Sequence, residues 1–230
     1  MKNSLSSQYK ALFREELQSR GFLLYKKTFY RVINDVVQTV MLCKTSATFT
    51  VDFNILPLCL QIKDLYCEGF DISVFRKEKG GWYCWEGCDI ESELRDILSL
   101  FRQHVIPIFD KGVDTKSAYE ELIRLEKMIY TGVPGGVIMN NYKYVMMCVK
   151  ANDYERAYQH MAAIITQNIG YIADCEKESI EDFSPNIQER LKELHRLSIP
   201  DVEYFQNMIA ENEALSLECL KCPRYPGERK

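Results

Sequence analysis

One stretch of the chain decides the fold: residues 21–40 read GFLLYKKTFYRVINDVVQTV. From position 25 onward the side chains follow a period of two, which is typical of a β-strand. Asn34 and Asp35 both tolerate turn geometry, so the stretch predicts a hairpin with a two-residue turn. That register places Arg31 opposite Gln38. Because both faces of the pair are largely apolar, we expect these strands to be covered on both sides.

Helices and further strands flank the predicted hairpin. Apolar residues at helical spacing precede it, and Gly21 fits the left-handed residue that ends a helix. Asp89 is a suitable cap for a later helix, which Pro107 should kink or end. Residues 1–112 therefore predict an α+β fold with an antiparallel β-meander of about five strands. The alternating segments that predict the further strands are 49–55, 70–74 and 82–87.

The rest of the chain has the pattern of helices. The segment DKGVD, residues 110–114, predicts the boundary between two parts, because glycine and acidic residues interrupt regular structure. We divide the chain into an α+β sheet domain, a helical hairpin region and a tail that we expect to be disordered, at residues 1–112, 113–220 and 221–230. The expected helices of the second part include 115–130, 137–150, 154–168 and a last one over 200–220.

Charge and cysteine usage limit the classes of partner. The net charge of −4 disfavours a nucleic-acid partner, because neutralising phosphates needs a basic face. Residues 113–230 carry most of the acidity, with 14 Lys and Arg against 19 Asp and Glu. We expect neither a signal peptide nor a membrane partner, since no leader or uncharged window of about 20 residues is present. Nine cysteines without framework spacing favour a reducing, cytoplasmic location.

Short motifs in the first part resemble a known family. They are G-F at 21–22, T-F-Y-R at 28–31, D-V-V-Q at 35–38, F-T-V at 49–51 and V-I-P-I-F-D at 105–110. Together they resemble an uncharacterised bacterial domain family, domain of unknown function 4304, over roughly residues 1–110. The resemblance implies a bacterial protein with a curved antiparallel sheet and helices. It implies no activity.

A second similarity covers residues 138–169, which resemble a single tetratricopeptide-like helical hairpin. A short polar turn at 152–153 leads into a helix that opens with Tyr154 and Ala157, and the small alanine lets two helices approach closely. Only one copy is present, whereas helical solenoids need about three repeats. A plain helical hairpin is therefore favoured over a repeat unit.

The sequence offers no convincing catalytic or metal centre. Four thiolates could bind zinc, but the two cysteine pairs lie far apart in the chain and lack the glycines of a zinc knuckle. The weak zinc alternative would use Cys84, Cys88, Cys219 and Cys222. All three histidines fall in helical patterns, and no motif places one beside a nucleophile. We expect unlinked thiols, no cofactor and no catalytic residue.

A charged side chain among apolar neighbours must find a partner or reach water, so Arg31 and Gln38 need an explanation. They could form a hydrogen-bonded pair, extended to Asp52 or another acid, that holds the sheet in register. Alternatively, Arg31 could bind an anionic ligand or an acidic partner. Trp82 and Trp85 point to opposite faces of a strand, so one is expected to be partly exposed for a ligand or partner.

The function that these observations favour is non-catalytic: a bacterial cytosolic module that binds another protein. One version is an immunity- or antitoxin-like protein, because a small acidic chain suits neutralising a basic toxin. The alternative is a small-molecule or nucleotide-related enzyme that uses a polar cluster around Arg31 and Gln38. A third interpretation, RNA binding, is disfavoured by the net charge; it would use Lys26, Lys27, Tyr30 and Arg31.

Overall fold

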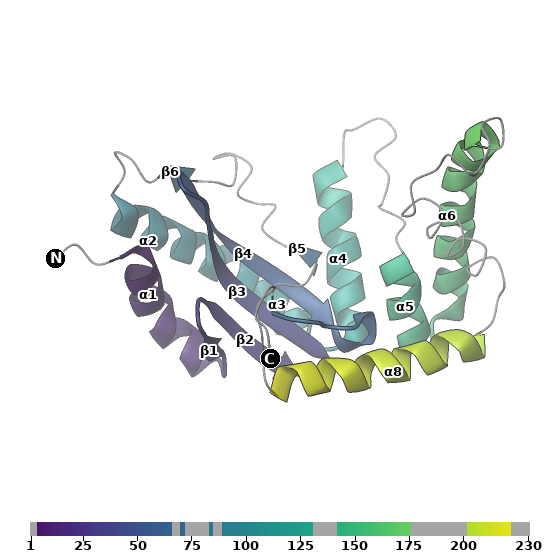
Figure 1. The fold of residues 1–230 in the computed structure, drawn as a ribbon, viewed down its shortest axis with the longest axis horizontal. Helices are drawn as coiled ribbons and strands as arrows, with labels where there is room; N and C mark the ends of the chain where they lie inside the picture. Colours follow the sequence, from purple (N-terminus) through teal and green to yellow (C-terminus); the bar gives the residue numbers. More distant parts are fainter. Residues whose placement is uncertain are drawn as a thin grey trace.

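The structure is a computed structural model in which an antiparallel sheet lies among helices and the C-terminal part is helical (Figure 1). It describes residues 4–65, 70–71, 83–84, 89–130, 142–175 and 202–221. The predicted α+β class is confirmed.

Four antiparallel strands build the sheet in the order in which they occur along the chain. They are β1 (Leu23–Tyr25), β2 (Thr28–Ile33), β3 (Val36–Lys44) and β4 (Thr48–Pro57). Two pairings of two residues each, β5 (Phe70–Asp71) and β6 (Tyr83–Cys84), extend the outer edge of β4. The meander is confirmed, but the expected count of about five strands is corrected to four, because the described residues of the later segments form only these short pairings.

The hairpin has the predicted register. Ile33 pairs with Val36 and Arg31 with Gln38, and the turn between them places Asn34 at a φ of 49°. Every residue of β3 except Lys44 is buried, as expected for a strand covered on both faces.

The predicted caps of the helices before and after the sheet are confirmed, whereas the helical path that begins after Asp89 does not end at Pro107 but continues to Lys111. In α1 (Leu5–Ser19), the side chain of Ser4 accepts a hydrogen bond from the Ser7 N–H, and Gly21 follows the helix with a φ of 81°. Asp89 caps α2 (Ile90–Leu100). That helix continues through a π-helical turn, η3 (Phe101–Val105), into α3 (Ile106–Lys111), and Pro107 lies in the first turn of α3. A proline tolerates this position because it needs no N–H there.

Helices α1 to α3 cover one face of the sheet through aromatic side chains. Tyr9 lies 5.7 Å from Phe29, and Phe101 lies 5.3 Å from Phe53 and 6.2 Å from Phe13, between ring centroids. The Tyr9 hydroxyl donates to the Val40 carbonyl at 2.8 Å, so this polar group is paired within the apolar layer.

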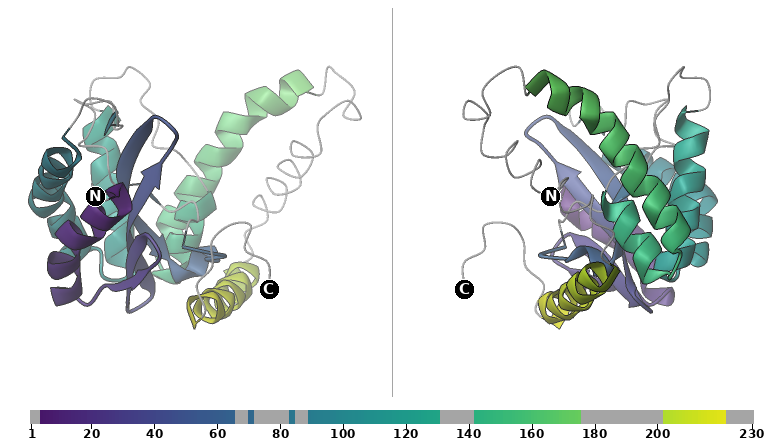
Figure 2. Two further views of the ribbon diagram at one scale, coloured as in Figure 1. Left: turned by 60° about the vertical axis from the view of Figure 1, so that its left-hand side comes forward. Right: turned by 90° about the vertical axis from the view of Figure 1, so that its right-hand side faces the viewer.

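The helical part follows at one end of the sheet, where α5 (Tyr142–Lys150) and α6 (Tyr154–Cys175) stand in front of the strands in the right-hand view of Figure 2. A turn at 151–153 joins α5 to α6, with Asn152 at a φ of 59°. Ala157 is buried, as the predicted helical hairpin requires. The elements of this part are α4 (Thr115–Tyr130), α5 (Tyr142–Lys150), α6 (Tyr154–Cys175) and α8 (Val202–Lys221).

Both parts share one hydrophobic core, which runs from Leu5 in α1 to Ile209 in α8. A smaller cluster lies on the opposite face of the sheet, where the last turn of α8 brings Leu220 against it. Its buried members are Val37, Leu56, Leu58 and Ile62.

Candidate functional site

The predicted polar pair exists, and its contacts are internal. The Arg31 Nε donates to the Gln38 side-chain carbonyl at 2.8 Å, and its Nη1 donates to the Arg20 carbonyl at 2.9 Å. The guanidinium also lies over the Phe22 ring, 4.8 Å from its centroid. A carboxylate of Asp110 stands 3.7 Å from Nη2. Arg31 is thus held on every side by the chain itself.

Gln38 extends this network into the junction between the two parts of the chain. It is fully buried, and its amide nitrogen donates to the carbonyls of Phe109, at 2.7 Å, and Gly112, at 3.0 Å. Both amide protons and the carbonyl oxygen are therefore engaged within the protein. A buried amide with all of these bonds made is well suited to fixing backbone segments.

Asp52 is not the acid that completes this network. It pairs with Met41 in the sheet, and Gln38 pairs with Ile55, so alternation puts Asp52 and Gln38 on opposite faces. Asp110, at the end of α3, takes the place that was considered for Asp52.

The hairpin turn has a role that sequence reasoning missed. Asp35 accepts hydrogen bonds from the backbone N–H and the hydroxyl of Thr115, at 2.9 and 2.8 Å, and Asn34 donates to the Val113 carbonyl at 3.0 Å. The turn thereby caps the first residue of α4 from 80 positions away. The turn residues predict the position of the hairpin, but no local pattern in the sequence predicts that Asp35 would bind Thr115.

The remaining predicted site residues are mostly outside the described part of the chain. Trp82, Trp85, Cys88 and Cys222 lie there, and of Cys84 only the backbone pairing is described. The Cys219 thiol donates to the Lys63 carbonyl at 3.1 Å. Among the described residues, no three His, Cys, Asp or Glu side chains are grouped to hold a metal ion.

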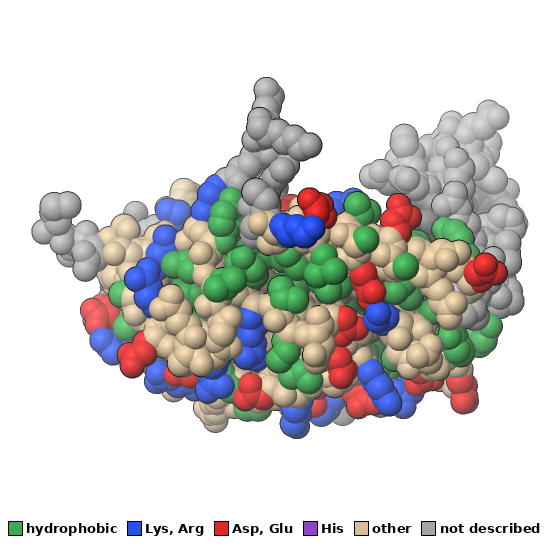
Figure 3. Space-filling view, turned by 90° about the horizontal axis from the view of Figure 1, so that it is seen from below, with side chains coloured by type: hydrophobic (Ala, Val, Ile, Leu, Met, Phe, Trp, Pro, Cys, Tyr) green, Lys and Arg blue, Asp and Glu red, His purple; other side chains and the backbone are tan. Residues whose placement is uncertain are grey.

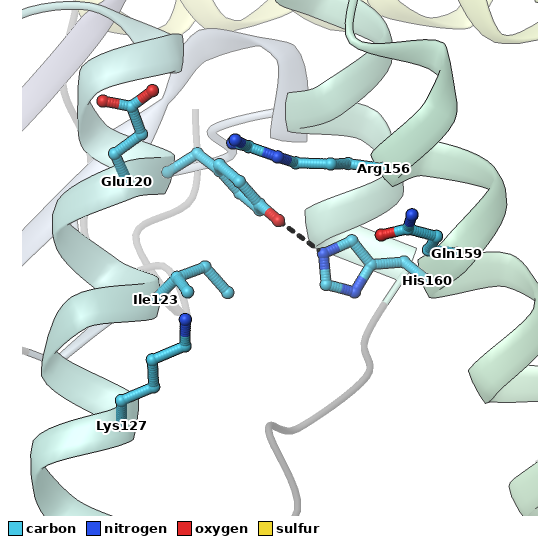
Figure 4. A pocket seen from close by; sticks show the side chains of 7 residues that line it. Glu120, Ile123, Lys127, Arg156, Gln159 and His160 are labelled. Carbon is cyan, nitrogen blue, oxygen red and sulfur yellow. Dashed lines mark hydrogen bonds between the residues drawn. The ribbon is translucent and has the colours of Figure 1, made fainter.

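A pocket of about 430 Å³ lies between α4 and α6 (Figure 4). Its volume is within the range of small-molecule sites. One face of each helix supplies the walls, since the lining positions recur at helical spacing. The lining residues are Tyr119, Glu120, Ile123 and Lys127 from α4, with Arg156, Gln159 and His160 from α6.

The rings of Tyr119 and His160 form the floor of this pocket. The Tyr119 hydroxyl and His160 Nε2 share a hydrogen bond of 2.7 Å, and both residues are buried. The His160 ring stacks on Tyr144, with 5.4 Å between centroids. The Tyr144 hydroxyl in turn donates to the Glu126 carboxylate. These contacts fix the orientation of both rings at the floor.

Burial keeps the floor uncharged near neutral pH. It lowers the pKa of His160, with a smaller contribution in the same direction from the Arg156 cation. It raises the pKa of the Tyr119 hydroxyl, and it raises the pKa of the nearby Cys148 to about 11. A thiol with so high a pKa is a poor nucleophile, so the floor does not form an activated cysteine–histidine pair.

A second candidate surface is the outward side of α8, which Figure 3 shows from below, with acidic side chains among apolar ones. Tyr204 and Leu215, exposed to 42% and 44%, lie on the same side of this helix because they are about three turns apart, whereas Leu217, exposed to 47%, follows Leu215 by two positions and points about 200° away from it. Large apolar side chains that are grouped on one exposed surface mark interaction sites more often than single ones do.

The inward side of α8 is fixed by hydrogen bonds to backbone groups. The Ser216 hydroxyl accepts from the Ile62 N–H at 2.7 Å and donates to the Leu58 carbonyl at 3.0 Å. Asn212 donates to the Cys59 carbonyl at 2.8 Å. An ion pair of 2.6 Å joins Glu213 to Lys150 of α5. The helix is therefore firmly oriented, and its outward side chains form a defined surface.

Comparison of the chain with protein-family models, with curated proteins and with solved structures finds no match. Within the described residues, none of the helices combines the length and the apolar character that crossing a bilayer requires.

Proposed function

We propose that this chain is a non-catalytic interaction module that binds a basic protein through the outward side of α8. The observation that carries the proposal is the exposure of Tyr204 and Leu215 on the same side of a well-anchored helix. Apolar side chains of this kind supply the buried centre of an interface.

The charge of the same surface indicates the class of partner. Glu203, Glu211 and Glu218 are exposed on α8, and Lys221, which pairs with Glu218 at 2.8 Å, is its one cation. A basic partner would complement this pattern and be steered toward it. A second copy of the chain would bring like charges together, which disfavours self-association through α8.

This proposal agrees with an immunity- or antitoxin-like role, in which a small acidic protein neutralises a basic one in the bacterial cytoplasm. The similarity of the sheet motifs to domain of unknown function 4304 stays a prediction, and it adds no activity. The alternative, a small-molecule or nucleotide-related enzyme built around Arg31 and Gln38, has less support, because Gln38 is buried and its amide is engaged inside the chain.

The test uses the intact chain, immobilised and exposed to bacterial cytosol at low ionic strength. We expect it to retain a basic protein that Tyr204→Ser/Leu215→Ser retains poorly, with the affinity of the purified pair falling about tenfold or more. Glu211→Lys should weaken binding further as a charge reversal. Raising the salt concentration should also weaken it, since exposed charges are screened.

Matched control variants lie on other elements. Leu23→Ser removes an exposed apolar side chain from β1, and Glu15→Lys reverses an exposed charge on α1. Both should retain the partner as the unmodified chain does. If the α8 variants and these controls capture the same proteins equally well, α8 is not the binding surface.

A further inference from the structure

The pocket between α4 and α6 has features that the proposed protein interaction does not use. It lies on different residues from the outward side of α8, and it is a concave site rather than an exposed surface. Of its lining residues, the cations Lys127 and Arg156 and the amide Gln159 are exposed and so lie at the mouth, whereas Tyr119 and His160 are buried and form the floor. Figure 4 shows Arg156 and Lys127 on different sides of His160. The division between mouth and floor calls for a ligand with one charged end and one uncharged end.

The mouth holds two cations and an amide. Arg156 is positioned by Asp153, whose carboxylate lies 3.3 Å from the Arg156 Nε, and by the Tyr119 ring, 5.8 Å from the guanidinium carbon. Neither contact uses the two terminal nitrogens of the guanidinium. These nitrogens form no hydrogen bond with any residue that the structure describes. A planar pair of N–H donors of this type matches a carboxylate geometrically.

Carboxylates near these cations limit how much negative charge the pocket accepts. Glu120 lines the pocket beside the cations Lys127 and Arg156, and Asp153 already pairs with the latter. The site as a whole is therefore not strongly positive. The charges of Arg156, Lys127, Glu120 and Asp153 cancel, so a bound monoanion leaves one net negative charge in the site and a phosphate dianion leaves two, which Glu120 opposes more strongly.

The deeper part of the pocket suits an uncharged group. Ile123 supplies an apolar wall, and the Tyr119 and His160 rings supply flat surfaces. Because His160 is buried and loses its proton more easily than an exposed histidine, it adds no charge there at neutral pH.

We propose that the pocket between α4 and α6 binds a small organic monocarboxylate. Arg156 and Lys127 bind the carboxylate at the mouth, Gln159 adds an amide hydrogen bond, and the uncharged body of the ligand packs on Ile123 and the two rings. Binding here is an additional property of the chain, and it does not depend on α8 or on its partner.

The test titrates the full chain at pH 7.5 with benzoate and hexanoate, followed by heteronuclear NMR and calorimetry. Benzamide and hexanamide serve as neutral analogues, and phthalate serves as a dianion. We expect saturable binding of a monocarboxylate with chemical-shift changes centred on α4 and α6. The matching amide should bind about tenfold or more weakly, because it lacks the charge-assisted hydrogen bonds.

Single substitutions test which charged side chains of the pocket bind the carboxylate. Arg156→Gln and Lys127→Gln should each weaken binding about tenfold, and Arg156→Lys should lose less because it keeps the charge. Glu120→Gln should improve the binding of phthalate relative to benzoate. The matched controls are Arg124→Gln and Lys116→Gln, which remove exposed cations of α4 that do not line the pocket.

Three results would overturn the proposal: no saturable binding of either monocarboxylate at millimolar concentration, equal binding of acid and amide, or unchanged affinity in the two lining variants. A circular dichroism spectrum of each variant separates loss of binding from loss of fold. Loss of protein-partner capture in the α8 variants has no bearing on these outcomes.

Discussion

Gln38 shows how one buried amide can join three segments of a chain. It sits in the middle of β3, accepts from Arg31 on β2, and donates to two carbonyls at the end of α3. A residue of the same shape without hydrogen-bonding groups would leave each of those partners unsatisfied in a dry environment. Its position in the sheet, rather than any catalytic need, explains why a polar residue occurs there.

Replacing Gln38 with leucine should therefore lower the free energy of unfolding by about 3 kcal/mol, the cost of leaving buried partners unpaired. Urea denaturation followed by circular dichroism measures the change. The control is Gln18→Leu, at an exposed position of α1, for which we expect a change within about 0.5 kcal/mol. A stable Gln38→Leu protein that had lost binding to a ligand would instead support a functional role for the pair.

His160 gives the stability of the chain a pH dependence of known sign. Its pKa is lowered in the folded protein by burial and by Arg156, so the unfolded chain binds a proton more readily. The stabilisation is present above the pKa of an unfolded histidine, about 6.5, and is lost as the pH falls below that value.

We expect the unmodified chain to lose more stability between pH 7.5 and pH 5 than His160→Asn does, measured as the shift in urea midpoint. His104→Asn, at an exposed position of η3, is the control and should behave like the unmodified chain. An identical pH response in the His160 variant would mean that this residue keeps an ordinary pKa when folded.

At the scale of elements, the hairpin is joined to α4 through its turn residues, and α8 is joined to residues 58–62 through its own side chains. The hairpin register was predictable because alternation and a two-residue turn are local signals. Its attachment to α4 was not, since Asp35 and Thr115 meet only after the chain has folded. The segment 110–114 was interpreted as a boundary for the same reason: its glycine and acids resemble a linker, yet Gly112 and Val113 accept hydrogen bonds from the hairpin.

Helix α8 depends on side chains that bind backbone groups. Ser216→Ala should leave the Ile62 N–H without its partner, while the Leu58 carbonyl would keep the Gln61 N–H at 3.3 Å, and we expect the substitution to cost about 2 kcal/mol. In hydrogen exchange followed by mass spectrometry, the amides of α8 and of residues 58–63 should exchange faster in this variant than in the unmodified chain, and other amides should exchange at the same rate in both. Asn207→Ala, at an exposed position of the same helix, should leave exchange unchanged. Equal exchange in both variants would contradict the importance of the serine.

At the scale of the whole molecule, the candidate pocket is a product of tertiary packing. Tyr119 and His160 lie 41 positions apart, and each falls in an ordinary helical pattern. No spacing in the sequence relates them, and the predicted helical hairpin pairs α5 with α6, so it gives no indication of a pocket between α4 and α6. Arg31 and Gln38 were found because they are cross-strand neighbours, a relation that local pattern does encode.

The shared core also determines how the molecule should unfold. Core residues come from the sheet, from α1 to α3 and from all four described helices of the C-terminal part, and α4 contacts β4 while α5 contacts η1 (Leu58–Leu60). The side chain of Ile55 would lie 3.1 Å from a Cβ placed on Gly112, so the junction itself is tightly packed.

We expect one cooperative transition, in which amides of β3 and α5 lose protection at the same urea concentration. Residues 1–112 expressed alone should then fail to fold, because the apolar surface that α4 and α5 cover would be exposed to water. A well-dispersed NMR spectrum from that fragment, or two separate transitions in the intact chain, would show that the parts are independent domains.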